Sequence, residues 1–315
     1  MNAGWKTILK GIAGCVLAVV LVKAFLVTSC FIPSSGMENS LYEGEGVLVN
    51  KWSYGLRMPF PSVFGYHRIG SCDIRKGDIV LFNDPSPGNP SRWMERRGVF
   101  ISRCIGRAGD TLLLNRELID AENEVWSPDN KALYVYPSAQ EDTVQAILKA
   151  VGISENPLVG YTEEGDFIRS FSRYELYLVA QKGKGKVIFT PLNAKLAKEV
   201  HPYVQTCALP ILHPYVVPEK GIPVMVYPWN AVLLCNTIVS HEGKNATVQG
   251  DTLWVEGKPV RSYTFSKDYY WMASNDPVNL ADSRLFGFVP EECIIGKAWR
   301  IWFTTRKGRF LQRVE

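Results

Sequence analysis

The chain has 315 residues, 46% of them hydrophobic, so it can bury a substantial core in one large domain or two smaller ones. Its formal net charge of +4 is spread along the sequence without a block of consecutive lysines and arginines, which argues against a nucleic-acid partner. Seven cysteines without a C-x-x-C spacing and four histidines without an i,i+3 or i,i+4 pair predict neither a disulfide framework nor a metal site, and we expect no cofactor.

The first element in the chain is an apolar run at residues 11–32, GIAGCVLAVVLVKAFLVTSCFI, in which Lys23 is the single charged residue. About 20 mainly apolar residues are enough to cross a bilayer core as a helix. Lys6 and Lys10 precede the run, and the positive-inside rule then places the N-terminus in the cytoplasm and everything after Ile32 on the other side. We expect a single-pass anchor in which Lys23 snorkels to the outer interface or faces a polar partner.

Two other interpretations of the apolar run compete with a retained anchor. One is a cleaved signal peptide, and the other is a lipoprotein signal that ends at Cys30, because small residues precede this cysteine in VTSC. Lys23 argues against both, since it would fall within the apolar h-region of either signal.

After Pro33 the sequence predicts a mainly β architecture with small helices. Short runs rich in Val, Ile, Trp, Tyr and Thr alternate with Gly, Pro, Asn and Asp, which is typical of strands joined by tight turns. These runs lie at 46–55, 77–88, 99–114, 224–228, 245–260 and 296–304. One helix is predicted at 140–152, where Val144, Ile147, Leu148 and Val151 recur at helical spacing, and a weaker one at 190–200.

One segment suggests an error in the sequence itself. The tetrapeptide HPYV occurs at 201–204 and again at 213–216, and Gln205 to Ile211 can be back-translated into the end of a common sequencing adapter. We therefore expect residues 205–212 to be an assembly artefact and assign them no function. The alternative is a genuine turn flanked by a chance repeat, and resequencing the locus distinguishes the two.

Four segments behind the anchor resemble, in order, the motifs of bacterial signal peptidase I, a membrane-anchored serine endopeptidase that removes signal peptides with a Ser/Lys dyad. They are FIPSSGMENSLYEGEGVLVNKWSYGLRMP (31–59), KGDIVLF (76–82), FISRCIGRAGDTL (100–112) and YYWMASNDPVNLADSRLFGFVPEECIIGKA (269–298). The resemblance implies an anchor at 1–32, a signal peptidase-like core at 33–112 and 239–315, and an inserted variable domain at 113–238. It also implies the bacterial inner membrane as the location.

The same match places the catalytic positions of the family on residues that lack the catalytic groups. The nucleophile, a serine directly before the motif methionine, falls on Gly36 before Met37. The lysine base, which arginine follows in the family, falls on Ser102 before Arg103. A serine of the last motif that helps to hold the lysine falls on Leu280.

These substitutions remove the chemistry of the dyad. A dyad needs a hydroxyl to attack and a neutral amine to take its proton, and Gly36 offers no nucleophile. Arg103 cannot replace the lysine, because a guanidinium stays protonated in proteins. Loss of an essential residue typically costs on the order of a million-fold in turnover in serine proteases. We therefore expect a protein that is inactive by this mechanism.

Peptide binding can be retained when the catalytic groups are lost. Gly36 still supplies a backbone N–H, and Ser34 matches the family position whose hydroxyl helps to form the oxyanion hole. We expect Ser34, Gly36 and Met37 to border a groove that takes an extended peptide as an added strand. The expected partners are a signal peptide or preprotein segment, membrane lipid, and an intact signal peptidase paralogue or export machinery.

The other motif residues are interpreted as structural. Asp282 and Arg284, which flank Ser283, are expected to form an ion pair or a turn contact, and Gly77 and Asp78, after Lys76, a turn between strands. Several aromatic residues soon after the anchor fit either core packing or a surface that rests on lipid headgroups. They are Trp52, Tyr54, Phe60, Phe64 and Tyr66.

Two alternatives to an inactive peptide-binding protein stay open. The first is an active signal peptidase that uses a rearranged nucleophile such as Ser35, which needs a lysine near Gly36 in the fold. The second is a membrane-tethered structural subunit whose groove is closed, for example by Leu280. Function is decided by the site, and here the site departs from the pattern of the family.

Overall fold

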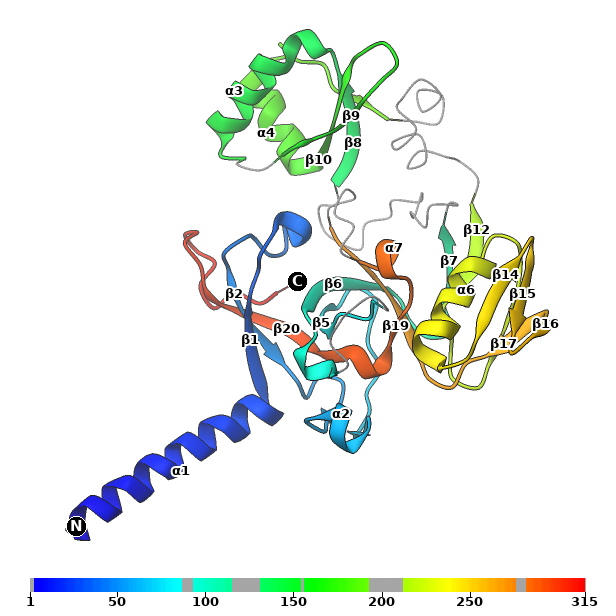
Figure 1. The fold of residues 1–315 in the computed structure, drawn as a ribbon. Coiled ribbons are helices and arrows are strands. Elements are labelled where there is room, and N and C mark those ends of the chain that lie inside the picture. The colour runs from blue at the N-terminus through cyan, green and yellow to red at the C-terminus, as the bar shows by residue number, and fades with distance from the viewer. Residues whose placement is uncertain are drawn as a thin grey trace.

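The computed structural model describes residues 3–86, 93–114, 131–153, 156–192, 212–275 and 282–314. Its first element is the helix α1 (Ala3–Phe25), which projects from the rest of the molecule in Figure 1. The stretch Ile8–Phe25 is long and apolar enough to cross a membrane, and none of it is buried against the rest of the chain. An apolar N-terminal helix, as predicted, is therefore present.

The helix ends earlier than the apolar run does. Residues Val27–Phe31 form the strand β1, which pairs in antiparallel register with β2 (Gly46–Asn50). Lys51, which follows β2, donates a backbone hydrogen bond to the carbonyl oxygen of Leu26. The β-branched residues Val27 and Thr28 suit this paired conformation, and pairing with a distant strand is not visible in local hydropathy. The predicted continuation of the helix to Ile32 is thus corrected.

A seven-stranded antiparallel sheet forms the centre of the molecule (Figure 1). Its strand order is β1-β2-β20-β5-β6-β18-β19, so the strand near the C-terminus lies between two strands from the first third of the chain. The remaining strands are β5 (Ile79–Asn83), β6 (Val99–Gly106), β18 (Tyr269–Ala273), β19 (Val289–Pro290) and β20 (Ile294–Phe303).

Two apolar clusters pack on this sheet. On β5, Ile79 belongs to a cluster with Met37 and Leu41, whereas Val80 and Phe82 belong to a second cluster with Cys104 and Met272. This division follows the two-residue alternation of side chains along a strand. The first cluster packs beneath the segment that carries Gly36, and so the core of the sheet directly supports the candidate site.

A group of small sheets extends from the far end of the central sheet. The core of these small sheets is continuous with the central sheet, since Trp271 of β18 is buried in the same cluster as Leu114 and Tyr215. The elements are β7 (Thr111–Leu114), β12 (His213–Val216), β13 (Pro223–Met225), β14 (Ala246–Gln249), β15 (Thr252–Val255), β16 (Lys258–Val260), β17 (Ser262–Thr264), α6 (Ala231–Thr237) and the π-helical turn η6 (Ile238–Glu242).

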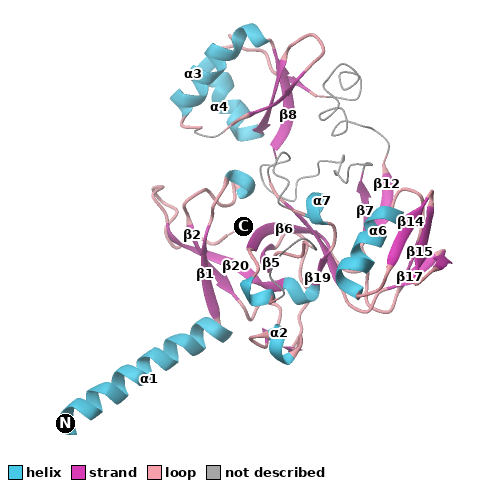
Figure 2. Ribbon diagram, in the orientation of Figure 1, coloured by secondary structure: helices cyan, strands magenta, loops and turns pink. Residues whose placement is uncertain are grey.

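Residues 131–153 and 156–192 form an α/β unit with its own core. Figure 2 shows its helices α3 and α4 on one side of the strands. The helix predicted at 140–152 is confirmed as α3, and Gly152 ends it in a left-handed conformation. The elements are β8 (Lys131–Tyr136), α3 (Glu141–Val151), β9 (Leu158–Tyr161), β10 (Phe167–Ser172), α4 (Arg173–Gly183) and β11 (Thr190–Pro191).

The second predicted helix does not begin where expected. Thr190 and Pro191 form β11, which pairs with Val135 and Tyr134 of β8, and residues 193–200 lie outside the described residues. Of the suspected artefact at 205–212, residues 205–211 also lie outside them, and the proposed division at 113 and 238 stays a prediction.

Several short elements complete the fold, which is mainly β with small helices, as predicted. They are η1 (Ser35–Met37), β3 (Leu56–Arg57), α2 (Pro61–Phe64), β4 (Arg68–Ile69), η2 (Met94–Arg96), η3 (Ser138–Gln140), α7 (Ser283–Phe286) and η7 (Glu291–Cys293).

Candidate functional site

Gly36 lies in a short 3₁₀ turn that the core holds from below. The chain leaves β1, passes Ser34 in an extended conformation, and turns through η1. The backbone N–H of Glu38 donates to the carbonyl of Ser35 at 2.9 Å, and that of Leu41 to the carbonyl of Met37 at 2.7 Å. Met37 and Leu41 are buried, which leaves Ser34 exposed and Ser35 partly exposed on the outer side of the turn.

A cavity of about 170 Å³ lies beside this turn. Its walls are mainly apolar, and the hydroxyls that its described lining residues carry belong to Ser34 and Ser274. The expected trio of Ser34, Gly36 and Met37 is therefore brought together at one cavity. The lining residues are Cys30, Phe31, Ile32, Pro33, Ser34, Gly36, Met37, Leu81, Val99, Phe100, Ile101 and Ser274.

The predicted base position lies on β6, close to the cavity. Ser102 pairs with Val80 of β5 and follows Ile101, which lines the cavity, although Ser102 is not among the described lining residues. Its side chain is 1% exposed, and its hydroxyl has no hydrogen-bond partner in the described part of the chain. Burial of a hydroxyl without a hydrogen-bond partner costs free energy. Hydrogen bonding of its side chain therefore does not account for a serine at this buried position.

Arg103 ties β6 to the segment that follows η1. Its guanidinium donates to the hydroxyl of Ser40 at 2.7 Å, to the carbonyl of Gly77 at 2.6 Å and to the side-chain oxygen of Asn275 at 3.4 Å. Burial lowers the pKa of Arg103 to about 10, and the negative charge of Asp78 opposes this shift. The guanidinium therefore stays protonated at neutral pH and serves as a buried cross-link.

Asn275 is a site residue that the sequence analysis did not single out. Its amide nitrogen donates to the carbonyl of Glu38 at 3.0 Å and to the hydroxyl of Ser40 at 3.1 Å, and its oxygen accepts from Arg103. It thus joins the end of β18 to the turn that carries Gly36. The contact between Asn275 and Glu38 spans more than 230 residues of sequence, so no local pattern could have indicated it.

The Lys-Gly-Asp motif forms the expected turn. Gly77 adopts φ +90°, and its N–H donates to the carbonyl of Cys104. Asp78 accepts from the hydroxyl of Tyr54 at 2.9 Å and pairs with Lys297 of β20 at 2.5 Å, while Lys76 pairs with Asp110 at 3.2 Å. These contacts fix the start of β5 against β20 and β6.

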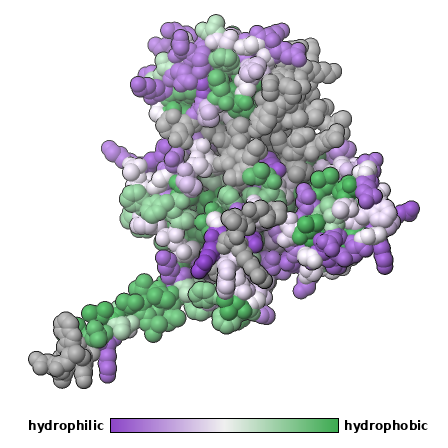
Figure 3. Space-filling model, in the orientation of Figure 1, coloured by the Kyte–Doolittle hydropathy of each residue, from purple (hydrophilic) through white to green (hydrophobic). Residues whose placement is uncertain are grey.

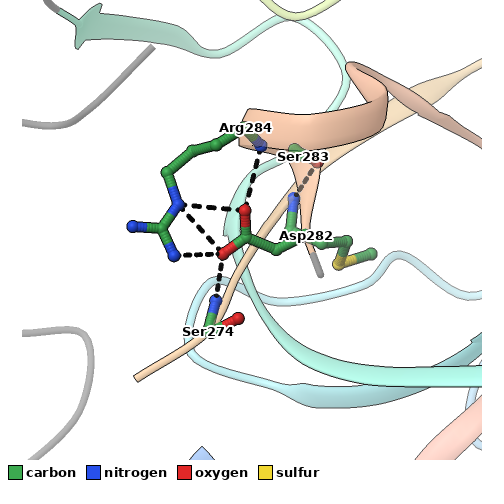
Figure 4. Close-up of polar contacts among 5 residues, drawn as sticks. Ser274, Asp282, Ser283 and Arg284 are labelled. Atoms are coloured by element: carbon green, nitrogen blue, oxygen red, sulfur yellow. Dashed lines mark hydrogen bonds and ion pairs between the residues drawn. The ribbon is translucent and has the colours of Figure 1, made fainter. Parts of the chain in front are cut away.

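The expected ion pair between Asp282 and Arg284 is present (Figure 4). The two side chains meet at 2.6 Å, and Asp282, which is fully buried, also accepts from the N–H of Ser274 at 2.8 Å. Ser283 accepts from the N–H of Met272 at 2.8 Å. The motif therefore holds the segment that brings Ser274 to the cavity and Asn275 to the turn that carries Gly36. Leu280 lies outside the described residues.

Comparison with known proteins gives one consistent match. The family model for signal peptidase, peptidase S26, matches residues 5–155, and relatives called signal peptidase I align over most of this chain. The chain is thus similar to members of the signal peptidase family. The Buchnera aphidicola (Acyrthosiphon pisum) relative is 23% identical over 93% of this chain and 73% of its own length.

Two further relatives illustrate the similarity. Signal peptidase I of Helicobacter pylori strain J99 is 21% identical over 92% of this chain and 80% of its own length. Signal peptidase I of Pseudomonas aeruginosa is 37% identical, but over 103 residues, which are 32% of either chain. Similarity to family members thus extends along nearly the whole chain and is stronger over a shorter part of it.

Proposed function

We propose that this chain is a member of the signal peptidase family that holds signal-peptide or preprotein segments at the outer face of the bacterial inner membrane without cleaving them by the Ser/Lys mechanism. The observation that carries the proposal is the cavity of about 170 Å³ beside Gly36. At the position where the family has its nucleophile, this chain has space for a small side chain and offers the backbone N–H of Gly36. It lacks the nucleophilic group itself.

The surroundings of the cavity suit an extended peptide. In the described part of the chain, β1 pairs with β2 alone, so its other edge is available for one more strand. Cys30, Ile32 and Ile101 provide apolar contact for alternate side chains of such a strand. Main-chain hydrogen bonds to β1 would provide affinity, and the apolar cavity would select the side chain that enters it.

The chemistry of the site supports binding without cleavage. Gly36 has no side chain to attack a carbonyl carbon, and Ser102 has no amine to accept a proton. Burial raises the pKa of Cys30, the one thiol among the described lining residues, to about 11, which disfavours the thiolate nucleophile.

The alternative of an active enzyme rests on Ser34 and Ser35. Ser34 lines the cavity and Ser35 begins the turn, so either hydroxyl lies close to where a peptide would bind. A general base is what this alternative lacks: the described residues that line the cavity include no lysine, histidine, aspartate or glutamate. The proposal of an inactive site is therefore preferred.

Cleavage of a signal-peptide substrate tests the proposal directly. The full-length protein, purified in detergent, is compared with a variant that carries Gly36→Ser, Ser102→Lys and Leu280→Ser. We expect no cleavage by the natural sequence and measurable cleavage by the triple variant. Cleavage by the natural sequence contradicts the proposal, and loss of that activity in Ser34→Ala or Ser35→Ala would identify the nucleophile.

Binding is measured separately from cleavage. The natural protein is titrated with a fluorescent signal peptide, and the matched variant Ile101→Arg places a charge in the apolar cavity. We expect binding that this variant abolishes. If neither protein binds the peptide, the groove is closed and the structural-subunit alternative is favoured.

A further inference from the structure

A second and larger cavity, of about 410 Å³, lies where the anchor meets the domain. Its walls come from the last turn of α1, from β1, from Lys51 at the end of β2, and from the segment Arg57 to Pro61 that leads into α2. It shares Cys30, Leu81 and Val99 with the cavity beside Gly36, so the two cavities adjoin.

Positive charge gathers at this second cavity. The ammonium group of Lys51 donates to the carbonyl oxygens of Lys23 at 2.9 Å and of Ala24 at 3.1 Å, which satisfies two carbonyls at the end of α1. An ammonium has three donors, so one further hydrogen bond from Lys51 is available to a ligand. Arg57 contributes a second cation to the wall, where it donates to the side-chain oxygen of Asn83 at 3.2 Å.

The charges at the cavity are not balanced by acids in its wall. None of the described residues that line it is Asp or Glu. Burial lowers the pKa of Lys51, and the positive charges of Arg57 and Lys23 lower it further. A bound anion would reverse this repulsion, and so the cavity is electrostatically complementary to an anionic ligand.

The position of the cavity identifies the source of the anion. Ala24 lies in the last turn of the apolar stretch Ile8–Phe25, at the level where the hydrocarbon core gives way to headgroups. On the other side of the cavity, Phe60, which precedes α2, and Val63 and Phe64 within it are exposed by 57%, 56% and 66%. Figure 3 shows apolar atoms that continue from the anchor onto the adjoining part of the domain.

We propose that this cavity binds the phosphate of an anionic phospholipid, held by Lys51 and Arg57, with the acyl chains lying along α1 and the tip of α2. A phosphate offers the acceptor oxygens that an ammonium and a guanidinium need. An apolar rim on one side and cations within match the two ends of a lipid molecule. The inference is independent of the proposed peptide binding, because it uses neither Gly36 nor Ser102.

Lipid retention by the full-length protein tests the assignment. The protein is equilibrated in mixed micelles with equal amounts of phosphatidylglycerol and phosphatidylcholine that carry the same acyl chains, and the lipid retained is measured by native mass spectrometry. We expect preferential retention of phosphatidylglycerol. Lys51→Gln and Arg57→Gln should each weaken it about fivefold, and the double variant about 25-fold, given the usual contribution of one basic residue at a lipid surface.

Matched controls separate this site from general surface charge. Glutamine at position 51 keeps donors for the carbonyls of α1 while it removes the charge. Lys258→Gln and Arg261→Gln make the same charge changes on exposed residues of the distant β16 region, and we expect them to leave retention unchanged. Equal thermal unfolding of the two double variants in detergent checks that the fold is intact.

Three outcomes would overturn the proposal. They are equal retention of both lipids, unchanged retention in the Lys51→Gln, Arg57→Gln double variant, and displacement of the lipid by inorganic phosphate or glycerol 3-phosphate at the same concentration. The last result would show a site for a soluble anion. If a signal peptide loses affinity in the double variant as strongly as the lipid does, the cavity belongs to the peptide groove.

Discussion

At the scale of single residues, a well-supported scaffold surrounds Gly36, the residue that we place at the nucleophile position. Arg103, Asn275 and Ser40 connect three segments that are distant in sequence, and each of the three is almost fully buried. The scaffold positions the turn that carries Gly36. Sequence similarity could place Arg103 in a motif, but it could not show that its partners would be Ser40 and Asn275.

Removal of the Asn275 amide should loosen this turn. Asn275→Ala removes the hydrogen bonds that the Asn275 amide donates to the carbonyl of Glu38 and to the hydroxyl of Ser40, and the loss of a buried hydrogen bond costs about 1–3 kcal/mol. We expect faster hydrogen exchange of the amides of Glu38, Ser40 and Leu41, measured by mass spectrometry. Asn245→Ala, at an exposed position, is the control. Unchanged exchange in Asn275→Ala would show that the turn is held by packing alone.

At the scale of elements, the sequence predicted what local pattern determines. The helical spacing of apolar residues at 140–152 predicted α3, and the Lys-Gly-Asp motif predicted the turn at Gly77. The helix α4 was missed, although the capping box of Ser172 and Glu175 was a readable start signal. The end of α1 could not be read from hydropathy, because the pairing of β1 with β2 determines it.

The π-helical turn η6 carries a partly buried histidine that makes its stability depend on pH. Burial lowers the pKa of His241 to about 4, and the positive charges of Lys267 and Arg97 contribute. Glu242 follows His241 in the chain, and Tyr269 lies near His241 in the fold. The carboxylate of Glu242 accepts a hydrogen bond from the hydroxyl of Tyr269 at 2.7 Å. The unfolded histidine, with a pKa near 6.5, binds a proton more readily than the folded one.

Stability from His241 should therefore be full above pH 6.5 and be lost as the pH falls towards 4. The loss should approach about 3 kcal/mol, from a pKa difference of about 2.5 units. Hydrogen exchange of the α6 and η6 amides, corrected for intrinsic rates, measures the local opening free energy. His241→Phe should flatten this dependence, whereas His67→Phe should not. A slope that persists in His241→Phe would assign it to other groups.

At the scale of the whole molecule, the arrangement of anchor and domain predicts a topology. If the domain is extracytoplasmic, a membrane-impermeant maleimide added to intact spheroplasts should label the exposed Cys72. The described thiols of Cys104, Cys235 and Cys293 are buried, and the Cys72→Ser variant gives the background. Labelling that requires permeabilised membranes would place the domain in the cytoplasm and contradict the orientation that Lys6 and Lys10 predict.

The junction between anchor and domain has a mechanical consequence. Leu26 alone separates α1 from β1, and the side chain of Lys51 donates to carbonyls in the last turn of the helix. No flexible linker therefore lies between α1 and the domain. The five residues of β1 span about 17 Å, and Gly36 lies beyond the end of this strand. If α1 spans a membrane and the cavity binds a peptide as we propose, the length of β1 restricts binding to peptides whose own membrane segment ends at a matching height.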